Sequence, residues 1–310
     1  MCRRDIKACQ SKGKTILLSI GGATYAEGGF GSDGEARQWA KTIWAMFGPE
    51  GDRTVNRPFG SAVLDGFDLD FEAPSSNMVP FASELRSLMD AAAAGSTNKY
   101  FLSVAPQCVF PDVANNDMLQ AVSFDFVSVQ FYNNWCGVNG YVPGSSTQNR
   151  FNFETWDNWA KTASKNPAVK ILLGVLGSPT AGGGYVSGDQ LTSVIAYSRQ
   201  FSSFGGVMAW DMSQVFGNPG FLDAVAAGLS GSNPIPTLTT SITSCGQAPT
   251  PSPSPSPTSS GSSNPGPGPT PTGSLVPQWG QCGGKGYTGP TECQPPFKCV
   301  VGSEWWSDCR

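Results

Sequence analysis

Three acidic side chains, Asp68, Asp70 and Glu72, recur at every second position of the run 62–72, so a strand would carry them on one face. Neighbouring carboxylates repel one another, and burial raises their pKa values, so such a row does not stabilise a fold. A solvated edge strand could carry the same acids for solubility. That alternative is weak here, because the opposite face needs a layer to pack against; it carries Phe67, Leu69 and Phe71. We therefore interpret the run as a strand that directs its acids into an active site.

The composition narrows the chemistry that these acids could perform. The 310 residues include no histidine, which excludes Ser-His-Asp and Cys-His catalysis and imidazole metal sites. Proton transfer would then depend on carboxylates, tyrosines or lysines. The chain has 19 Lys and Arg against 23 Asp and Glu, without a basic block, so we expect no nucleic-acid partner. No apolar run is long enough to span a bilayer, so we expect no membrane partner.

The elements that must position the acids form a repeating pattern between residues 5 and 228. Short apolar runs alternate with amphipathic stretches, which predicts strand–helix units around a parallel sheet. The expected strands are 15–20, 62–71, 100–105, 124–131, 169–175 and 205–210. The expected helices include 5–11, 35–47, 80–94, 156–164 and 189–201. Polar or glycine-rich turns follow several strands, as is typical of a (β/α)8 barrel. Six strands are two fewer than a barrel needs, so we expect one that lacks about its first two units.

The last 80 residues change character twice. Residues 231–274 are rich in Pro, Ser, Thr and Gly and cannot bury a core, so we expect an extended linker after a catalytic domain at 1–230. Residues 275–310 are too few for an unaided hydrophobic core, and their four cysteines predict two disulfides in a small all-β unit. Exposed indoles in this unit would stack on sugar rings. Clustered cysteines and the linker favour an extracellular or cell-wall location.

Several motifs give the chain a close resemblance to a known family. The run Asp65-Gly-Phe-Asp68-Leu-Asp70-Phe-Glu72 resembles the DxxDxDxE signature of family 18 glycoside hydrolases, the chitinases. Ser19-Ile-Gly-Gly22 resembles the SxGG strand of that family. Further motifs at 105–108, 130–134, 182–185 and 205–211 resemble the plant and fungal class III endochitinases, in the same order along the chain. The last unit is similar to the fungal-type family 1 carbohydrate-binding module.

The resemblance also bears on the start of the chain. In the family, the SxGG and DxxDxDxE motifs lie on the third and fourth strands of the barrel. We therefore expect an N-terminal truncation that removed the first two units. Met1-Cys2-Arg3-Arg4-Asp5 is not a signal peptide, since no apolar segment follows it, and we expect that signal to have been lost with them.

The resemblance implies endo-acting hydrolysis of β-1,4-N-acetylglucosamine linkages in chitin, with retention and with the acetamido group of the substrate as nucleophile. It makes Glu72 the general acid, kept protonated by burial and by the charge of Asp70. Asp70 would orient the acetamido group, Asp68 would tune Asp70, and Tyr132 would bind the acetamido oxygen. The implied substrate contacts are Gln130, Trp210, Gly21, Gly22 and Tyr185. Asp65 lies an odd step away on the strand, and we interpret it as supporting.

The same resemblance implies the cysteine pairs and the binding face of the module. Cys108 would pair with Cys136, Cys282 with Cys299, and Cys293 with Cys309. Cys9 could pair with Cys2, and Cys245 has no obvious partner. The module would bind chitin or cellulose through Trp279, Trp305, Trp306 and Gln281, while Asp308 replaces the usual Gln.

Two other functions remain open at this stage. An inactive lectin-like protein would bind chitin or cellulose without cleaving it, although such proteins usually lose the acid that Glu72 provides. A metal-dependent enzyme could use the clustered acids as ligands for Mg²⁺ or Ca²⁺. The hydrolase reading predicts a monomer with no cofactor and no metal.

Overall fold

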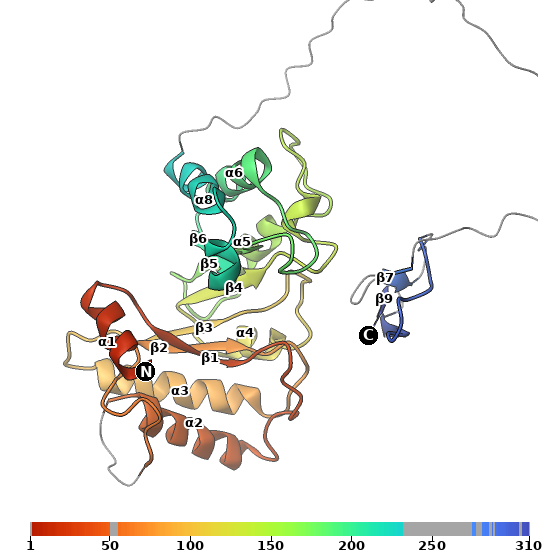
Figure 1. The fold of residues 1–310 in the computed structure, drawn as a ribbon. Coiled ribbons are helices and arrows are strands. Elements are labelled where there is room, and N and C mark those ends of the chain that lie inside the picture. Colours follow the sequence, from red (N-terminus) through yellow and green to blue (C-terminus); the bar gives the residue numbers. More distant parts are fainter. Residues whose placement is uncertain are drawn as a thin grey trace, which may run out of the picture. The chain divides into compact units, whose positions relative to one another are not determined.

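A computed structural model describes residues 2–49, 55–231, 275–276, 281–284, 287, 289–303 and 306–309. The chain divides into two compact units, Met1–Leu238 and Thr239–Arg310. The first unit holds the acidic strand and the second holds the four clustered cysteines. The trace of the chain is drawn in Figure 1.

The first unit is built on six parallel strands in the order in which they occur along the chain. They are β1 (Leu17–Gly21), β2 (Gly66–Asp70), β3 (Phe101–Val104), β4 (Phe126–Gln130), β5 (Lys170–Leu176) and β6 (Phe204–Trp210). Because each strand pairs with the next, every C-terminal strand end lies at the same edge of the sheet. The predicted parallel α/β sheet is confirmed, with β1 and β6 as its first and last strands.

Helices alternate with the strands, as predicted. They are α1 (Cys2–Ser11), α2 (Asp33–Phe47), α3 (Met78–Ala93), α4 (Asn116–Ala121), the 3-10 helix η1 (Val138–Gly140), α5 (Phe153–Thr162), α6 (Gly188–Ser198), α7 (Met212–Phe216) and α8 (Phe221–Ser230). Figure 1 shows α2 and α3 running together alongside the first three strands. None of the described helices combines the length and apolar character needed to cross a bilayer.

One continuous core lies between the strands and these helices. Its largest fully buried side chains include Trp156, Phe67, Phe131 and Phe153. The edge of the Tyr100 ring packs on Trp44 of α2, and Trp44 also contacts Phe67 of β2. These contacts hold the apolar face of the acidic strand against the helix layer, which leaves its acids to face the other way.

The strand that carries the acids is shorter than the sequence predicted. We expected it to begin at residue 62, and it begins at Gly66. Ala62 and Leu64 are buried, yet their backbone groups bond elsewhere. Leu64 N–H donates to the Phe47 carbonyl at the end of α2, and Arg57 donates to the Ala62 carbonyl. Burial alone therefore did not indicate a strand here.

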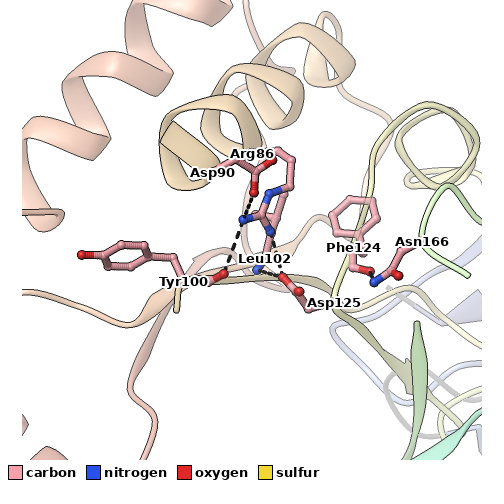
Figure 2. A network of polar contacts seen from close by, with 7 residues as sticks. All are labelled: Arg86, Asp90, Tyr100, Leu102, Phe124, Asp125 and Asn166. Atoms are coloured by element: carbon pink, nitrogen blue, oxygen red, sulfur yellow. Dashed lines mark hydrogen bonds and ion pairs between the residues drawn. The ribbon is translucent and has the colours of Figure 1, made fainter. Parts of the chain in front are cut away.

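The N-terminal ends of β3 and β4 are held by the polar network drawn in Figure 2. Asp125, directly before β4, accepts hydrogen bonds from the Leu102 N–H at 2.8 Å and from Arg86 Nη1 at 2.9 Å. Arg86 also contacts Asp90, one turn along α3, at 2.7 Å. Asn166 donates to the Phe124 carbonyl at 2.8 Å. At this end of the sheet Arg86 is therefore paired with both Asp90 and Asp125.

The second unit is small and its described strands are antiparallel. Strands β7 (Gln281–Gly283), β9 (Trp306–Cys309) and β8 (Cys299–Ser303) pair in that order. Disulfides join Cys282 to Cys299 and Cys293 to Cys309, with Cα separations of 5.8 and 5.6 Å. Trp279 and Trp305 lie outside the described residues, and only the backbones of Gln281, Trp306 and Asp308 are described.

Candidate active site

The three acids of the predicted site lie at the C-terminal end of β2. Asp70 is 8% exposed, whereas Asp68 and Glu72 are partly buried. The alternate residues Phe67, Leu69 and Phe71 are each at most 2% exposed. The alternation in the sequence therefore corresponds to an apolar face packed in the core and an acidic face directed away from it.

Asp68 is held by serines on both neighbouring strands. Ser19 Oγ of β1 donates to Asp68 Oδ2 at 2.9 Å, and Ser103 Oγ of β3 donates to Oδ1 at 2.6 Å. Both serines are register partners of Asp68 in the sheet. The two bonds fix the orientation of this carboxylate beside Asp70.

Gln130, the last residue of β4, brings its amide to both of the other acids. Its Nε2 atom donates to Asp70 Oδ1 at 3.1 Å, to the Ala105 carbonyl at 3.0 Å and, more weakly, to Glu72 Oε1 at 3.5 Å. We expected Gln130 to contact a sugar. In the structure its amide nitrogen donates to protein acceptors, and Gln130 thereby connects Asp70 to Glu72.

Burial and crowding keep protons on Asp70 and Tyr132. Burial raises the pKa of Asp70 from 3.8 to about 7, and the nearby charges of Glu72 and Asp68 add to the effect. Burial likewise raises the pKa of Tyr132, with further contributions from Asp70, Glu72 and Asp68. The Tyr132 hydroxyl therefore stays protonated and is available as a hydrogen-bond donor.

Glu72 has a raised pKa for a reason that the sequence did not reveal. Burial raises its pKa, the hydrogen bond from Gln130 lowers it, and the charge of Asp112 raises it. We expected Asp70 to be the charged neighbour. The two acids do interact, since the charge of Glu72 raises the pKa of Asp70, and Asp112 from the loop after β3 adds to the burial that raises the pKa of Glu72.

The two glycines of the SxGG motif pack against the acidic strand. A Cβ atom on Gly21 would lie 2.4 Å from the Asp70 carbonyl oxygen, and its φ of +108° also favours glycine. The Gly22 N–H donates to the same oxygen at 2.6 Å. The close backbone approach that we expected at these positions is therefore made with β2.

The remaining predicted contacts lie around the same edge of the sheet. Trp210, the last residue of β6, is 47% exposed. Tyr185 follows the glycine-rich turn 182–184 and is partly buried, with its hydroxyl accepting a hydrogen bond from Asn218 Nδ2 at 2.7 Å. Asp65 lies at the opposite end of β2 and accepts bonds from the Ile16 N–H and Gln10, so it ties the first strand to the second.

A disulfide joins two loops at this edge. Cys108, after β3, is bonded to Cys136, after β4, with a Cα separation of 5.8 Å. The Cys108 carbonyl also accepts hydrogen bonds from Asn152 and Trp156. Cys9 is a free thiol among the described side chains. The side chain of Cys2, and Cys245 as a whole, lie outside the described residues.

The acids of the site have no basic partner among the described residues. Among the described residues, no ion pair involves Asp68, Asp70, Glu72 or Asp112. An acid of raised pKa beside a carboxyl group and a protonated tyrosine hydroxyl can donate a proton and hold a polar group of a substrate. The arrangement therefore fits general-acid cleavage of a bond at the C-terminal edge of the sheet.

Residues 3–183 match the family model described as glycosyl hydrolases family 18. The chain belongs to this family. Its motifs at β1, β2 and β4 are thus family 18 motifs, and the class III resemblance holds as well. The chain is 56% identical over 218 residues to Endochitinase 33 of Trichoderma harzianum, a match that covers 70% of this chain and 67% of the relative. Residues 278–306 match the model described as fungal cellulose binding domain.

Solved structures of family 18 character resemble the first unit. The chitinase ICChI from Ipomoea carnea is 28% identical, with a TM-score of 0.59, over 73% of this chain and 78% of that one. A tamarind chitinase-like lectin is 25% identical, with a TM-score of 0.52, over 73% of this chain and 76% of that one. The family 18 fold is thus found in proteins described as an enzyme and as a lectin, and the site must distinguish the two.

Proposed function

We propose that this chain hydrolyses internal β-1,4-N-acetylglucosamine linkages in chitin with retention of configuration. The observation that carries the proposal is the arrangement of Asp68, Asp70 and Glu72 with Tyr132 and Gln130 at one edge of the sheet. Family 18 enzymes act by substrate assistance, in which the acetamido group of the sugar replaces the second carboxylate as nucleophile. The site supports this because Gln130 donates a hydrogen bond to Asp70, and a carboxyl group that keeps its proton is a poor nucleophile.

In this mechanism Glu72 protonates the glycosidic oxygen while the acetamido oxygen attacks the anomeric carbon. Asp70 accepts a hydrogen bond from the acetamido N–H, and the Tyr132 hydroxyl donates to the acetamido oxygen. Asp68 tunes Asp70 by sharing a proton or a hydrogen bond with it. Trp210 provides an exposed indole on which the cleaved sugar stacks, and Tyr185 lines the same cleft. Water then attacks the anomeric carbon and breaks its bond to the acetamido oxygen, while the Glu72 carboxylate takes up a proton from that water.

The organisation around this site is part of the same proposal. We assign residues 1–230 to a catalytic domain whose strands are six consecutive strands of a (β/α)8 barrel, 231–274 to a linker and 275–310 to a carbohydrate-binding module. The module would hold the enzyme on chitin or cellulose through Trp279, Trp305, Trp306 and Gln281, which raises the local substrate concentration. The three disulfides favour secretion.

Replacement of the acid by its amide tests the activity. Glu72→Gln keeps the shape of the side chain and removes its proton, so kcat on a soluble chitin oligosaccharide should fall roughly 10²–10⁴-fold. Binding of the same oligosaccharide, measured by calorimetry, should persist. Glu154→Gln, on the exposed surface of α5, is the matched control and should leave kcat unchanged.

The lectin function makes a different forecast for the same experiment. The likeness to the tamarind chitinase-like lectin favours it. A lectin would bind the oligosaccharide equally before and after Glu72→Gln, and neither protein would release products. Hydrolysis by the unmodified protein that disappears in the variant excludes the lectin, and hydrolysis that persists in the variant removes Glu72 from the role of acid.

A further inference from the structure

The loop between β3 and α4 carries a buried carboxylate that the motifs do not include. Asp112 is 4% exposed. Its Oδ1 atom accepts hydrogen bonds from the Asn115 N–H at 2.8 Å, from Asn115 Nδ2 at 2.8 Å and from the Ala114 N–H at 3.2 Å. Its Oδ2 atom accepts from the Gln107 N–H at 3.2 Å.

All four partners of Asp112 are N–H donors. A protonated carboxyl group would need one acceptor for its own hydrogen, and none of these partners can accept. Burial raises the pKa of Asp112, and these hydrogen bonds oppose that rise because they favour the ionised form. Among the described residues Asp112 makes no ion pair, so its negative charge is not neutralised by a cation.

Asn115 joins this carboxylate to the acidic strand. Its Nδ2 atom donates both to Asp112 Oδ1 and to the carbonyl of Phe71, the residue directly before Glu72, each at 2.8 Å. Because both of these groups are acceptors, the orientation of the Asn115 amide is unambiguous. A single side chain, 1% exposed, thus connects the Asp112 carboxylate to the backbone next to the acid.

The other end of the loop holds Gln130. The Gln130 N–H donates to the Pro106 carbonyl at 2.8 Å, and the Cys108 N–H donates to the Gln130 carbonyl at 3.2 Å. Asp112 binds the N–H of Gln107, the residue between these two contacts. The carboxylate therefore supports both sides of the acid, through Phe71 and through the strand end that carries the Gln130 amide.

We propose that Asp112 is a positioning residue for the general acid: its carboxylate, bonded to N–H donors alone, places a negative charge beside the strand end that carries Glu72, and its hydrogen bonds hold the loop 106–115 against the end of β2. This inference rests on the role proposed for Glu72. If the loop 106–115 served only as a turn, the hydrogen bonds of Asp112 would suffice and its charge would not matter.

The other groups around Glu72 cannot substitute for this charge. The titratable groups that face the strand end are Asp68 and Asp70 on β2, Tyr132 after β4 and Asp112 after β3. Below about pH 7, Asp70 and Tyr132 both keep their protons. After burial, Asp112 is the contribution that raises the pKa of Glu72, against the opposing hydrogen bond from Gln130.

The test separates the charge of Asp112 from its hydrogen bonds. Asp112→Asn retains the Oδ1 acceptor and three of the four bonds but loses the charge. In the full-length protein, the alkaline limb of kcat/KM against pH should move to lower pH by roughly 0.5–1 unit, since that limb reports loss of the acid's proton. Asp117→Asn, an exposed acid on α4, removes the same charge nearby and should leave the limb in place.

Asp112→Glu provides the rescue experiment, since it retains the charge. The alkaline limb of kcat/KM should fall at the same pH as in the unmodified protein, even if the altered geometry reduces kcat. An alkaline limb that is the same in Asp112→Asn and Asp117→Asn would overturn the inference.

A measurement on the unmodified protein covers the case in which Asp112→Asn does not fold. In a ¹³C titration of the side-chain carboxyl groups, Asp112 should be ionised before Glu72 begins to lose its proton. The reverse order would overturn the inference. Failure of the proposed function would look different, because Glu72→Gln would then retain its activity.

Discussion

Asp70 and Asp157 are buried acids associated with opposite ends of the same sheet, and their protonation is controlled in opposite ways. Asp70 is 8% exposed at the C-terminal end of β2, and Asp157 on α5 is 3% exposed beside Ser203, directly before β6. Burial raises the pKa of Asp70 to about 7. Burial would also raise the pKa of Asp157, but hydrogen bonds from Lys161 and Ser203 outweigh it, and the pKa of Asp157 is lowered.

The partners explain the difference. Asp157 receives the Lys161 ammonium at 2.5 Å, together with the hydroxyl and the N–H of Ser203. Asp70 receives one amide N–H from Gln130 and lies beside two other acids. Asp157 is thus paired with a cation, as Asp125 is with Arg86 before β4, whereas Asp70 at the C-terminal end of β2 makes no ion pair among the described residues and keeps its proton to higher pH.

Of the variants of Asp70 and Asp157, Asp70→Asn is expected to lower kcat the most. The amide cannot accept the acetamido N–H in the same way, so kcat on a chitin oligosaccharide should fall roughly 100-fold through misplacement of the nucleophile. A loss of less than about threefold would show that Asp70 does not orient the substrate.

The same substitution should increase stability at alkaline pH. The pKa of Asp70 is about 7 in the folded protein and 3.8 when unperturbed, so between pH 4 and 7 the unfolded chain releases a proton that the folded protein retains. The free energy of unfolding therefore falls as the pH rises through this range, by an amount on the order of 4 kcal/mol. Asp70→Asn removes that fall, so urea melts should show a gain at pH 8 and little change at pH 4.

Asp157→Asn should have a smaller effect of opposite sign. At pH 8 it replaces the carboxylate that binds Lys161 and Ser203, which should lower the free energy of unfolding by about 2 kcal/mol. Because a lowered pKa contributes stability above the ordinary value of 3.8 and loses it at lower pH, the difference should shrink below about pH 4. Glu154→Gln on the same helix is the control, and kcat should be unchanged in both variants. A stabilising Asp157→Asn at pH 8 would contradict the comparison.

The sequence predicted most of the residues of the site at the C-terminal end of β2, but little of the surroundings of Asp157. Alternation placed Asp68, Asp70 and Glu72 on one face because a strand has a period of two, and the family resemblance added Tyr132 and Gln130. The beginning of β2 was mispredicted because the backbone of the apolar residues 62–64 bonds to other partners, with Leu64 bonded to the end of α2 and Ala62 to Phe59 and Arg57.

The sequence alone could not show the environments that determine whether Asp112 and Asp157 are ionised. Lys161 lies one helical turn from Asp157, which a sequence can reveal, but Ser203 is 46 residues away. Asp112 reaches the acid through Asn115 and the Phe71 carbonyl, a contact 44 residues apart in the chain. Long-range hydrogen bonds to backbone groups leave no pattern in one sequence, and here they decide which acids are ionised.

The most direct test is a ¹³C NMR titration of the side-chain carboxyl groups of Asp70 and Asp157 in the unmodified protein. The account predicts that Asp70 titrates near pH 7, coupled to Glu72, and that Asp157 titrates below pH 4. Titration of both residues below pH 4 would contradict the claim that burial without a cationic partner keeps the proton on Asp70.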